Sequence, residues 1–336
     1  MTSKNTHKTQ LIDRFGRQVT YLRMSATDRC DLRCVYCMSE DMSFVPREQL
    51  LTLEEMIRIG TTAVDLGVNK IRITGGEPLT RKGIISVFQA LGKLEGLDDL
   101  TVTTNGTQLE RFAQPLKDAG VTRINISLDT LQKDRFKELT RNGKIEKTLA
   151  GIDAAIKANF NAIKINAVIL KNRNDDEILD LIRYVEERGI DISFIEEMPL
   201  GIISEHDRAE SYYSSDQIKA DIRQHHSLVR SRDKTGGPSR YYHLNRGASR
   251  VGFISPHSHN FCDSCNRVRL TAEGRLLLCL GQEHSVDLRR VVRANPLDDA
   301  PLRNALIQSM NIKPEGHEFS LAEQPILFRH MSATGG

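Results

Sequence analysis

The sequence RMSATDRCDLRCVYCMSE, residues 23–40, decides how the rest of the chain is interpreted, because three cysteines fall within eight of its residues. They are Cys30, Cys34 and Cys37, spaced C-x3-C-x2-C. Thiolates are soft ligands that suit iron–sulfur clusters or zinc. Three cysteines on a [4Fe-4S] cluster leave one iron without a protein ligand, and such an open position serves chemistry rather than structural support. The alternative is a zinc site completed by histidine, but the flanking histidines in the sequence, His7 and His206, are not local.

The composition is that of a folded chain without a strong preference for polymers or membranes. Of 336 residues, 39% are hydrophobic, and 47 basic against 44 acidic residues give a net charge of +3. This balance disfavours a nucleic-acid coat or a membrane-surface protein, so any basic site is local. No apolar run approaches the roughly 18–20 residues that span a bilayer, and the chain's start lacks the apolar core of a signal peptide. We expect a cytoplasmic protein, in which thiols stay reduced and disulfides do not explain the cysteines.

Short strand-like segments alternate with longer amphipathic segments in the first 200 residues. Strands are predicted at 21–25, 69–74, 100–104, 122–128, 162–169 and 191–198. Helices are predicted at 52–67, 107–120, 147–160 and 174–189. Thr52 and Glu55 form a capping-box pattern at the start of the first helix, and Asn174 and Gly189 mark the bounds of the last. The alternation predicts parallel strands with helical crossovers, as an open doubly wound sheet or as a complete or partial barrel. The first turn lacks GxGxxG, which disfavours a dinucleotide-binding sheet.

The unusual residues follow the predicted strands. After the cysteines come TGGEP (74–78), TTNG (103–106), SLDT (127–130) and MPLG (198–201). Loops at the carboxyl ends of parallel strands form the active face of barrel folds, so we expect these segments to gather on one face. Gly75 and Gly76 allow the backbone to approach a ligand, although an ordinary βα turn would also use them. Ser127 ends a strand and either reaches the same ligand or caps a helix.

The composition of the sequence changes after residue 200, where polar connecting segments that contain glycine and serine appear. Short strands are predicted at 240–244, 250–254 and 267–279, and helices at 285–294 and 298–309. We therefore expect residues 1–200 to form the barrel and residues 201–336 to form a smaller C-terminal extension.

The extension carries the other three cysteines, Cys262, Cys265 and Cys279, spaced C-x2-C-x13-C. One interpretation is a structural zinc ribbon with His257 or His259 as the fourth ligand. The other is a second [4Fe-4S] cluster with an open iron. Arg267 and Arg269 lie two residues apart and so share one face of a strand. Paired guanidinium groups beside a metal suit a phosphate-bearing substrate, although plain surface charge is the alternative.

The first cysteine spacing, with Tyr36 before the last cysteine, resembles the signature of radical S-adenosylmethionine (SAM) enzymes. The resemblance implies that SAM chelates the fourth iron and is cleaved reductively to a 5′-deoxyadenosyl radical. It implies a partial (β/α)6 TIM-like barrel with a C-terminal extension that carries a second iron–sulfur cluster. The segments LIDRFGR, IRITGGEPL, INISLDTL, FIEEMPLG and FCDSCNRVRLTAEG and the terminal GG resemble the branch that cyclises GTP in the first step of molybdenum cofactor biosynthesis.

This resemblance implies a role for each matching residue. The SAM cluster would be held by Cys30, Cys34 and Cys37, and the auxiliary cluster, which binds the guanine base, by Cys262, Cys265 and Cys279. The SAM site would be lined by Tyr36, Gly76, Ser127 and Met198. The GTP site would be lined by Arg23, Arg72, Thr103, Lys164, Arg267, Val268 and Arg269. Catalytic roles would fall to Arg267, Arg269, Gly335 and Gly336, although a C-terminal Gly-Gly is commonly only a mobile end.

Three of these residues, Arg23, Arg72 and Lys164, lie inside apolar strands, where an unpaired charge is costly. A triphosphate would provide their partner. The alternative is ion pairing within the protein, and the candidate carboxylates are Glu77, Asp129, Glu196 and Glu197.

The resemblance also implies partners: GTP, SAM, an electron donor such as flavodoxin or ferredoxin, a downstream cyclic pyranopterin monophosphate synthase, and a second copy in a homodimer. Three positions depart from the pattern, since many relatives have arginine at Ser193, proline at Ser39 and asparagine at Asp31; none is a cluster ligand. Two rival functions stay open. One is a radical SAM enzyme with one auxiliary cluster and another substrate, and the other is a zinc-stapled binding protein.

Overall fold

Twelve strands form one continuous sheet in the computed structural model, which describes residues 10–39, 42–201, 203, 206–233, 235–244, 247–317, 319 and 331–335. Its order is β12-β11-β10-β1-β2-β3-β4-β5-β6-β9-β8-β7. The central six strands are β1 (Tyr21–Ser25), β2 (Lys70–Thr74), β3 (Asp99–Thr104), β4 (Arg123–Ser127), β5 (Ala162–Val168) and β6 (Asp191–Ile195). These six strands are parallel and follow chain order without a reversal, which confirms the partial barrel over the doubly wound sheet.

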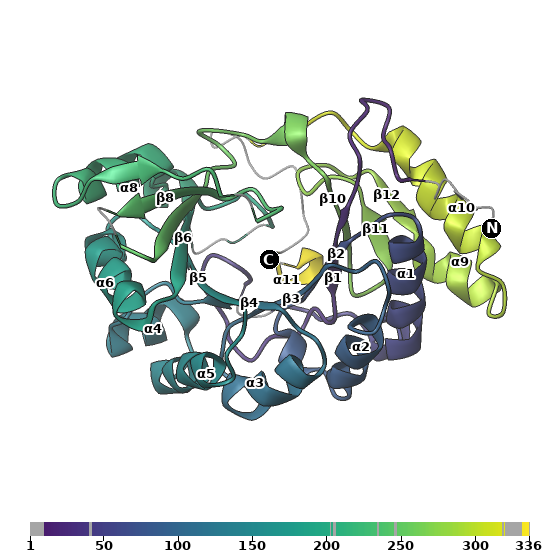
Figure 1. Cartoon of the computed structure of the whole chain (residues 1–336), viewed down its shortest axis with the longest axis horizontal. Helices are drawn as coiled ribbons and strands as arrows, with labels where there is room; N and C mark the ends of the chain where they lie inside the picture. Colours follow the sequence, from purple (N-terminus) through teal and green to yellow (C-terminus); the bar gives the residue numbers. More distant parts are fainter. Residues whose placement is uncertain are drawn as a thin grey trace, which may run out of the picture.

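Helices cover the outside of the arc that these strands form (Figure 1). They are α1 (Leu53–Asp65), α2 (Ile84–Leu91), α3 (Leu109–Asp118), α4 (Lys133–Thr140), α5 (Ile145–Lys157) and α6 (Ile178–Arg188). The sequence pattern does not predict α2 or α4, which are short helices of eight residues each.

The prediction that Asn174 caps the last of these helices is wrong. A short 3₁₀ turn, Asp175–Glu177, precedes α6, and the Asn174 side chain does not cap it. Its amide instead accepts from the Leu170 N–H (2.7 Å) and donates to the Asp129 carbonyl (2.7 Å). The buried amide therefore ties the loops after β4 and β5 together, and its own polar atoms are satisfied. The predicted end of α6 at Gly189 is confirmed, with φ +63°.

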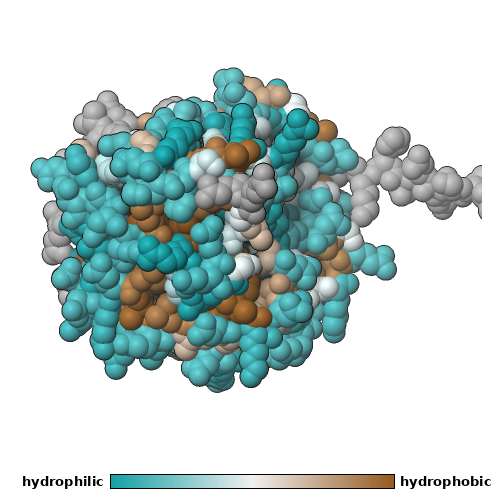
Figure 2. All heavy atoms as spheres, turned by 60° about the vertical axis from the view of Figure 1, so that its left-hand side comes forward, coloured by the Kyte–Doolittle hydropathy of each residue, from teal (hydrophilic) through white to brown (hydrophobic). Residues whose placement is uncertain are grey.

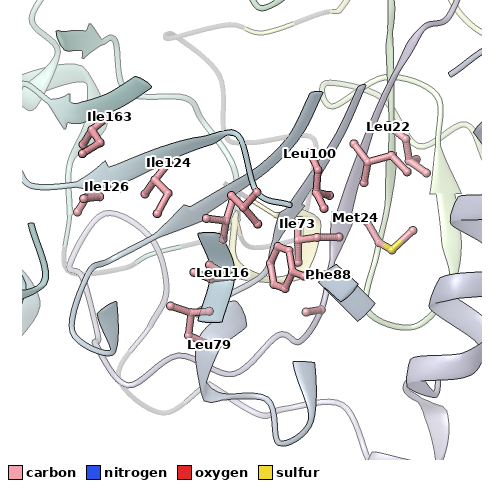
Figure 3. Packing of buried hydrophobic residues seen from close by; sticks show 14 of the residues in the cluster. Leu22, Met24, Ile73, Leu79, Phe88, Leu100, Leu116, Ile124, Ile126 and Ile163 are labelled. Atoms are coloured by element: carbon pink, nitrogen blue, oxygen red, sulfur yellow. The ribbon is translucent and has the colours of Figure 1, made fainter. Parts of the chain in front are cut away.

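The hydrophobic core lies between the strands and the outer helices (Figure 3). Leu22 and Met24 of β1 and Ile73 of β2 are fully buried in it, together with Phe88 of α2. Because side chains alternate along a strand, the residues between them, such as Arg23 and Arg72, face the inside of the arc. The packing of one face therefore fixes which side chains reach the interior.

The chain after residue 200 adds strands to both sides of the central six. At one side β9 (Arg250–Ile254) pairs parallel with β6, followed by β8 (Arg240–Leu244) and β7 (Leu228–Arg230). At the other side β10 (Arg267–Leu270) pairs parallel with β1, followed by β11 (Arg275–Leu277) and β12 (Ser285–Asp287). The single strand predicted at 267–279 is thus a hairpin that turns at Gly274, and the helix predicted at 285–294 begins with β12.

The remaining helices are α7 (Arg208–Ser211), α8 (Ser215–Arg223), α9 (Leu288–Ala294), α10 (Ala300–Ser309) and α11 (Met331–Thr334). Helix α11 lies inside the arc of strands rather than on its surface (Figure 1). Hydrophilic residues predominate on the face drawn in Figure 2. Within the described residues, no helix is both long and apolar enough to cross a membrane.

The capping box of α1 gives a test of local stability. Thr52 Oγ1 accepts from the Glu55 N–H (3.1 Å), and the Glu55 carboxylate accepts from the Thr52 N–H (2.8 Å). We expect Thr52→Ala to lower the free energy of unfolding by about 1 kcal/mol, because it removes the cap. Thr52→Ser, which keeps the hydroxyl, is the control. Urea unfolding followed by circular dichroism measures both, and equal stability of the two variants would contradict the assignment.

Candidate functional site

The first cavity lies over the loop after β1 that carries three cysteines, Cys30, Cys34 and Cys37, all with free thiols. The segments after β2, β3, β4 and β6 complete its lining together with Asn166 and Val168 of β5, so the loops predicted to share one face do so. The lining includes all four residues assigned to the SAM site from the sequence, Tyr36, Gly76, Ser127 and Met198.

Close backbone contact explains the two glycines after β2. A Cβ on Gly76 would lie 2.3 Å from the Arg29 carbonyl oxygen, and one on Gly75 would lie 2.6 Å from that of Thr27. Gly76 donates its N–H to the Thr27 carbonyl (2.7 Å), and Glu77 donates its N–H to the Arg29 carbonyl (2.8 Å). The glycines thus let the β2 loop lie directly on the cysteine loop, and any larger residue would separate them.

Two buried carboxylates hold the first cavity together. Glu77 accepts from the N–H groups of Leu79 (3.0 Å) and Asn105 (2.7 Å), and burial raises its pKa to about 7. Asp129 accepts from the Tyr36 hydroxyl (2.6 Å), and burial raises its pKa to about 6. Asp129 therefore fixes the ring that precedes Cys37, a role that the sequence pattern does not reveal.

The chemistry of the first cysteine set fits a metal cluster. Burial raises the pKa of Cys30 to about 12 and raises the pKa of Cys34 well above its ordinary value. A free thiolate is therefore unfavourable here, whereas iron would stabilise one directly. Asn105 Nδ2 lies 3.6 Å from Cys30 Sγ, a contact typical of groups that surround cluster thiolates.

The second cavity is lined by the other cysteine set, Cys262, Cys265 and Cys279. The histidines of the zinc alternative have other partners: His257 Nε2 lies 3.0 Å from the Glu197 carbonyl, and His259 Nε2 lies 3.0 Å from Asp216. Neither histidine lines the cavity, so the geometry does not favour a zinc ribbon. His317 does line it, and among the described residues its buried Nε2 has no hydrogen-bond partner. The spacing of the cysteines does not indicate His317, which lies 38 residues or more from each of them in the sequence.

A row of cations faces this cavity from three adjacent strands. Arg23 of β1 pairs in register with Arg269 of β10 on one side and with Arg72 of β2 on the other. Two residues earlier, Tyr21 pairs with Arg267 and Lys70 in the same way. All line the cavity. We call the five cations the basic wall: Arg23, Lys70, Arg72, Arg267 and Arg269.

The pKa values of residues in and beside the basic wall are shifted by burial and by the charges of their neighbours. Burial lowers the pKa of Arg23 to about 10; the charge of Tyr21 acts against this shift, and the charges of Arg72 and Arg267 add to it. Burial would raise the pKa of Tyr21, but the charges of Arg72, Arg23 and Lys70 outweigh it and lower that pKa to about 7. Such a concentration of positive charge favours binding of an anion.

The facing side of the cavity adds Lys164 of β5, whose Nζ lies 3.2 Å from the Tyr241 hydroxyl. Lys70, which the sequence analysis missed, is paired with Asp99 at 2.6 Å. The sequence does indicate this position for Lys70. It lies two residues before Arg72 in the same strand, so both side chains point to the inner face of the sheet.

The alternative of ion pairing within the protein is not what the structure shows for Arg72 and Lys164. Glu77 and Asp129 are bound as described above. Glu196 accepts from the Ser215 N–H (2.8 Å), and Glu197 from Arg208 Nε (3.2 Å). Among the described residues, none of these four carboxylates pairs with Arg72 or Lys164. Arg72 instead donates to the Tyr21 hydroxyl (2.6 Å) and to Thr103 Oγ1 (3.1 Å).

The two cavities adjoin, because Asn166, Ile195 and Met198 line both. The C-terminal tail lies beside this junction. The Gly335 carbonyl accepts from Arg269 Nη1 and, at 3.3 Å, from Arg23 Nη2. Gly336 lies outside the described residues.

The structure places the remaining predicted residues as follows. Val268 lines the second cavity, whereas Thr103 lines the first and reaches the basic wall through Arg72. Ser193 is buried and lies 2.9 Å from Ser239 through their hydroxyls. Ser239 lines the second cavity. The Ser193–Ser239 pair therefore contributes hydroxyl groups here, where an arginine at position 193 would contribute a positive charge.

Comparison with known families divides the chain into two matched regions. Residues 24–185 match the family described as Radical SAM superfamily, and residues 190–319 match the one described as Molybdenum Cofactor Synthesis C. Among solved structures, SuiB from Streptococcus suis is similar with a TM-score of 0.64 and 16% identity, over 95% of this chain and 78% of that one. At this identity the likeness concerns the fold alone.

Curated relatives match over nearly the whole length. A protein named GTP 3′,8-cyclase from Ectopseudomonas mendocina (strain ymp) is 56% identical over 98% of this chain and 100% of its own length. One of the same name from Pseudomonas entomophila (strain L48) is 57% identical over 97% of this chain and 98% of its own. With two thiol-lined cavities meeting inside a radical SAM barrel, the chain belongs to the GTP 3′,8-cyclase family of the radical SAM superfamily.

Proposed function

We propose that this protein converts GTP to (8S)-3′,8-cyclo-7,8-dihydro-GTP, the first step of molybdenum cofactor biosynthesis, with SAM and two [4Fe-4S] clusters. Membership of the cyclase family supports the reaction. The observation that carries the choice of substrate is the basic wall, because five inward-facing cations suit a triphosphate rather than a peptide or a neutral ligand.

In this proposal the first cavity binds SAM. Cys30, Cys34 and Cys37 hold its cluster, and Tyr36, Gly76, Ser127 and Met198 position the cofactor. The second cavity binds GTP, with the cluster at Cys262, Cys265 and Cys279 against the base. The basic wall, Lys164, Thr103 and Val268 surround the nucleotide. Since three residues line both cavities, the ribose can lie at their junction.

When bound, SAM and the clusters would supply the radical chemistry that joins ribose C3′ to guanine C8, with the final electron coming from the reductant and one proton taken up. The protein's residues orient the reactants and exclude water. Arg267 and Arg269 would hold the nucleotide while C3′ reaches C8. Gly335 and Gly336 would close the junction beside them.

Several further assignments belong to the same proposal. We propose residues 1–200 as the SAM-binding unit and residues 201–336 as the part that completes the GTP site. We also propose a cytoplasmic homodimer that receives electrons from a flavodoxin or ferredoxin and passes its product to cyclic pyranopterin monophosphate synthase. A related enzyme with another substrate is the second candidate, and the assay below separates the two.

Iron content and product formation test the proposal directly. Anaerobically reconstituted protein is expected to hold about eight irons per chain, as two four-iron clusters require. With SAM, reductant and GTP it should release 5′-deoxyadenosine and a cyclised guanosine nucleotide, identified by mass spectrometry. Cys265→Ser should keep about four irons and lose the product. Bound zinc without iron, or a nucleotide left unchanged while another substrate reacts, would contradict the proposal.

The basic wall is tested by neutralising its member on β2. Arg72→Met is expected to raise the Kd for GTP about 10- to 100-fold, because a hydrogen bond to a charged group contributes about 1.5–3 kcal/mol. Arg123→Met is the control, since Arg123 lies on β4, two strands from β2, pairs with Asp99 at 4.0 Å and lines neither cavity. Equilibrium dialysis without SAM measures both, and equal affinities would refute the assignment.

The C-terminal tail is tested at the position where a side chain does not fit. A Cβ on Gly335 would lie 2.3 Å from Thr74 Cγ2, and its φ of +76° disfavours other residues. We expect Gly335→Ala, alone and with Gly336→Ala, to reduce turnover while iron content stays unchanged. Gly189→Ala is the control, because Gly189 has a similar φ of +63° but open space around it. Unchanged turnover would exclude an active role for the tail.

A further inference from the structure

A buried lysine, Lys313, lies behind the second cysteine set. Lys313 follows the 3₁₀ turn Met310–Ile312, and its side chain belongs to the largest fully buried ones, with 1% of the residue exposed. Among the described residues no carboxylate forms an ion pair with it. A buried ammonium group costs several kcal/mol unless it is paired, so its location requires an electrostatic explanation.

The atoms around the Lys313 ammonium group belong to the cysteine site. Its Nζ donates to the carbonyls of Leu278 (2.7 Å) and Arg267 (3.2 Å) and lies 3.9 Å from Cys265 Sγ. Leu278 precedes Cys279, so the lysine joins the two chain segments that supply thiols.

The backbone around Lys313 is held in place from outside the cavity. Arg17 donates to the carbonyls of Cys262 (2.9 Å), Pro314 (2.6 Å) and Glu315 (2.5 Å). Asp13 fixes Arg17 through an ion pair of 2.7 Å. The Arg17 guanidinium group therefore holds both the cysteine loop and the segment that carries Lys313. These contacts fix the backbone on both sides of the pair formed by Lys313 Nζ and Cys265 Sγ.

We propose that Lys313 is a positioning residue of the auxiliary cluster, whose ammonium group binds the Cys265 thiolate and raises the reduction potential of that cluster. The inference rests on the proposed function, since it requires a [4Fe-4S] cluster at Cys262, Cys265 and Cys279. Reduction adds negative charge to a cluster, so a fixed positive charge nearby stabilises the reduced form. In the low-dielectric interior this effect is not screened by solvent.

The test is a redox titration followed by electron paramagnetic resonance. The full-length chain with Cys30, Cys34 and Cys37 replaced by serine serves as the parent, so that only the auxiliary cluster contributes a signal. Lys313→Gln removes the charge and keeps an N–H donor, whereas Lys313→Met removes both. We expect both to lower the potential by at least 59 mV, which is a tenfold change in the one-electron equilibrium constant. Lys219→Gln is the control, because Lys219 is also buried but contacts Asp216 and aromatic rings.

The outcomes separate the inference from the proposed function. Iron-loaded variants with the parent's potential would overturn the role of Lys313. A shift in Lys313→Met alone would also overturn it, since it would assign the effect to a lost hydrogen bond and not to charge. A parent that binds no iron would instead refute the auxiliary cluster itself. Equal lowering in both variants, with no change in Lys219→Gln, supports the inference.

Discussion

The alternation of side chains along β10, β1 and β2 is the constraint on which the rest of the structure depends. Leu22 and Met24 pack outward against the helices, so Arg23 between them must face the interior. Parallel register then aligns the inner residues of the three strands side by side. The hydrophobic packing of one face thus assembles like charges on the other. That arrangement is unfavourable by itself and becomes favourable when a polyanion binds.

The topology explains why the basic wall and both cysteine sets meet. β10 comes more than 200 residues after β1 in the sequence but pairs with it in parallel, which brings Arg269 beside Arg23. The same strand begins two residues after Cys265, so the second cysteine set lies at one end of the wall. The first set follows β1 directly, at the carboxyl ends of the strands. The pairing of β10 with β1 therefore sets the separation between the two cavities.

Much of the fold follows from local sequence signals, whereas the completed site depends on long-range pairing. Strand β1 and the capping box of α1 match the expectation residue for residue, because a short apolar run and a Thr-x-x-Glu pattern act locally. The sequence predicts one strand where β10 and β11 form a hairpin, because the turn depends on a single glycine, Gly274, in a left-handed conformation. Lys313 could not have been found, because nothing near it in sequence indicates burial beside Cys265.

The position of the C-terminal tail follows from the same electrostatic argument. The Gly335 carbonyl accepts hydrogen bonds from Arg23 and Arg269, so it satisfies donors of the basic wall. A carbonyl carries no net charge, however, and leaves the positive charge of the wall in place for an anion. Its approach to Thr74 leaves no room for a side chain. The carbonyl of Gly335 therefore orders the two arginines without neutralising their charge, and the backbone conformation and the contact with Thr74 both favour glycine at this position.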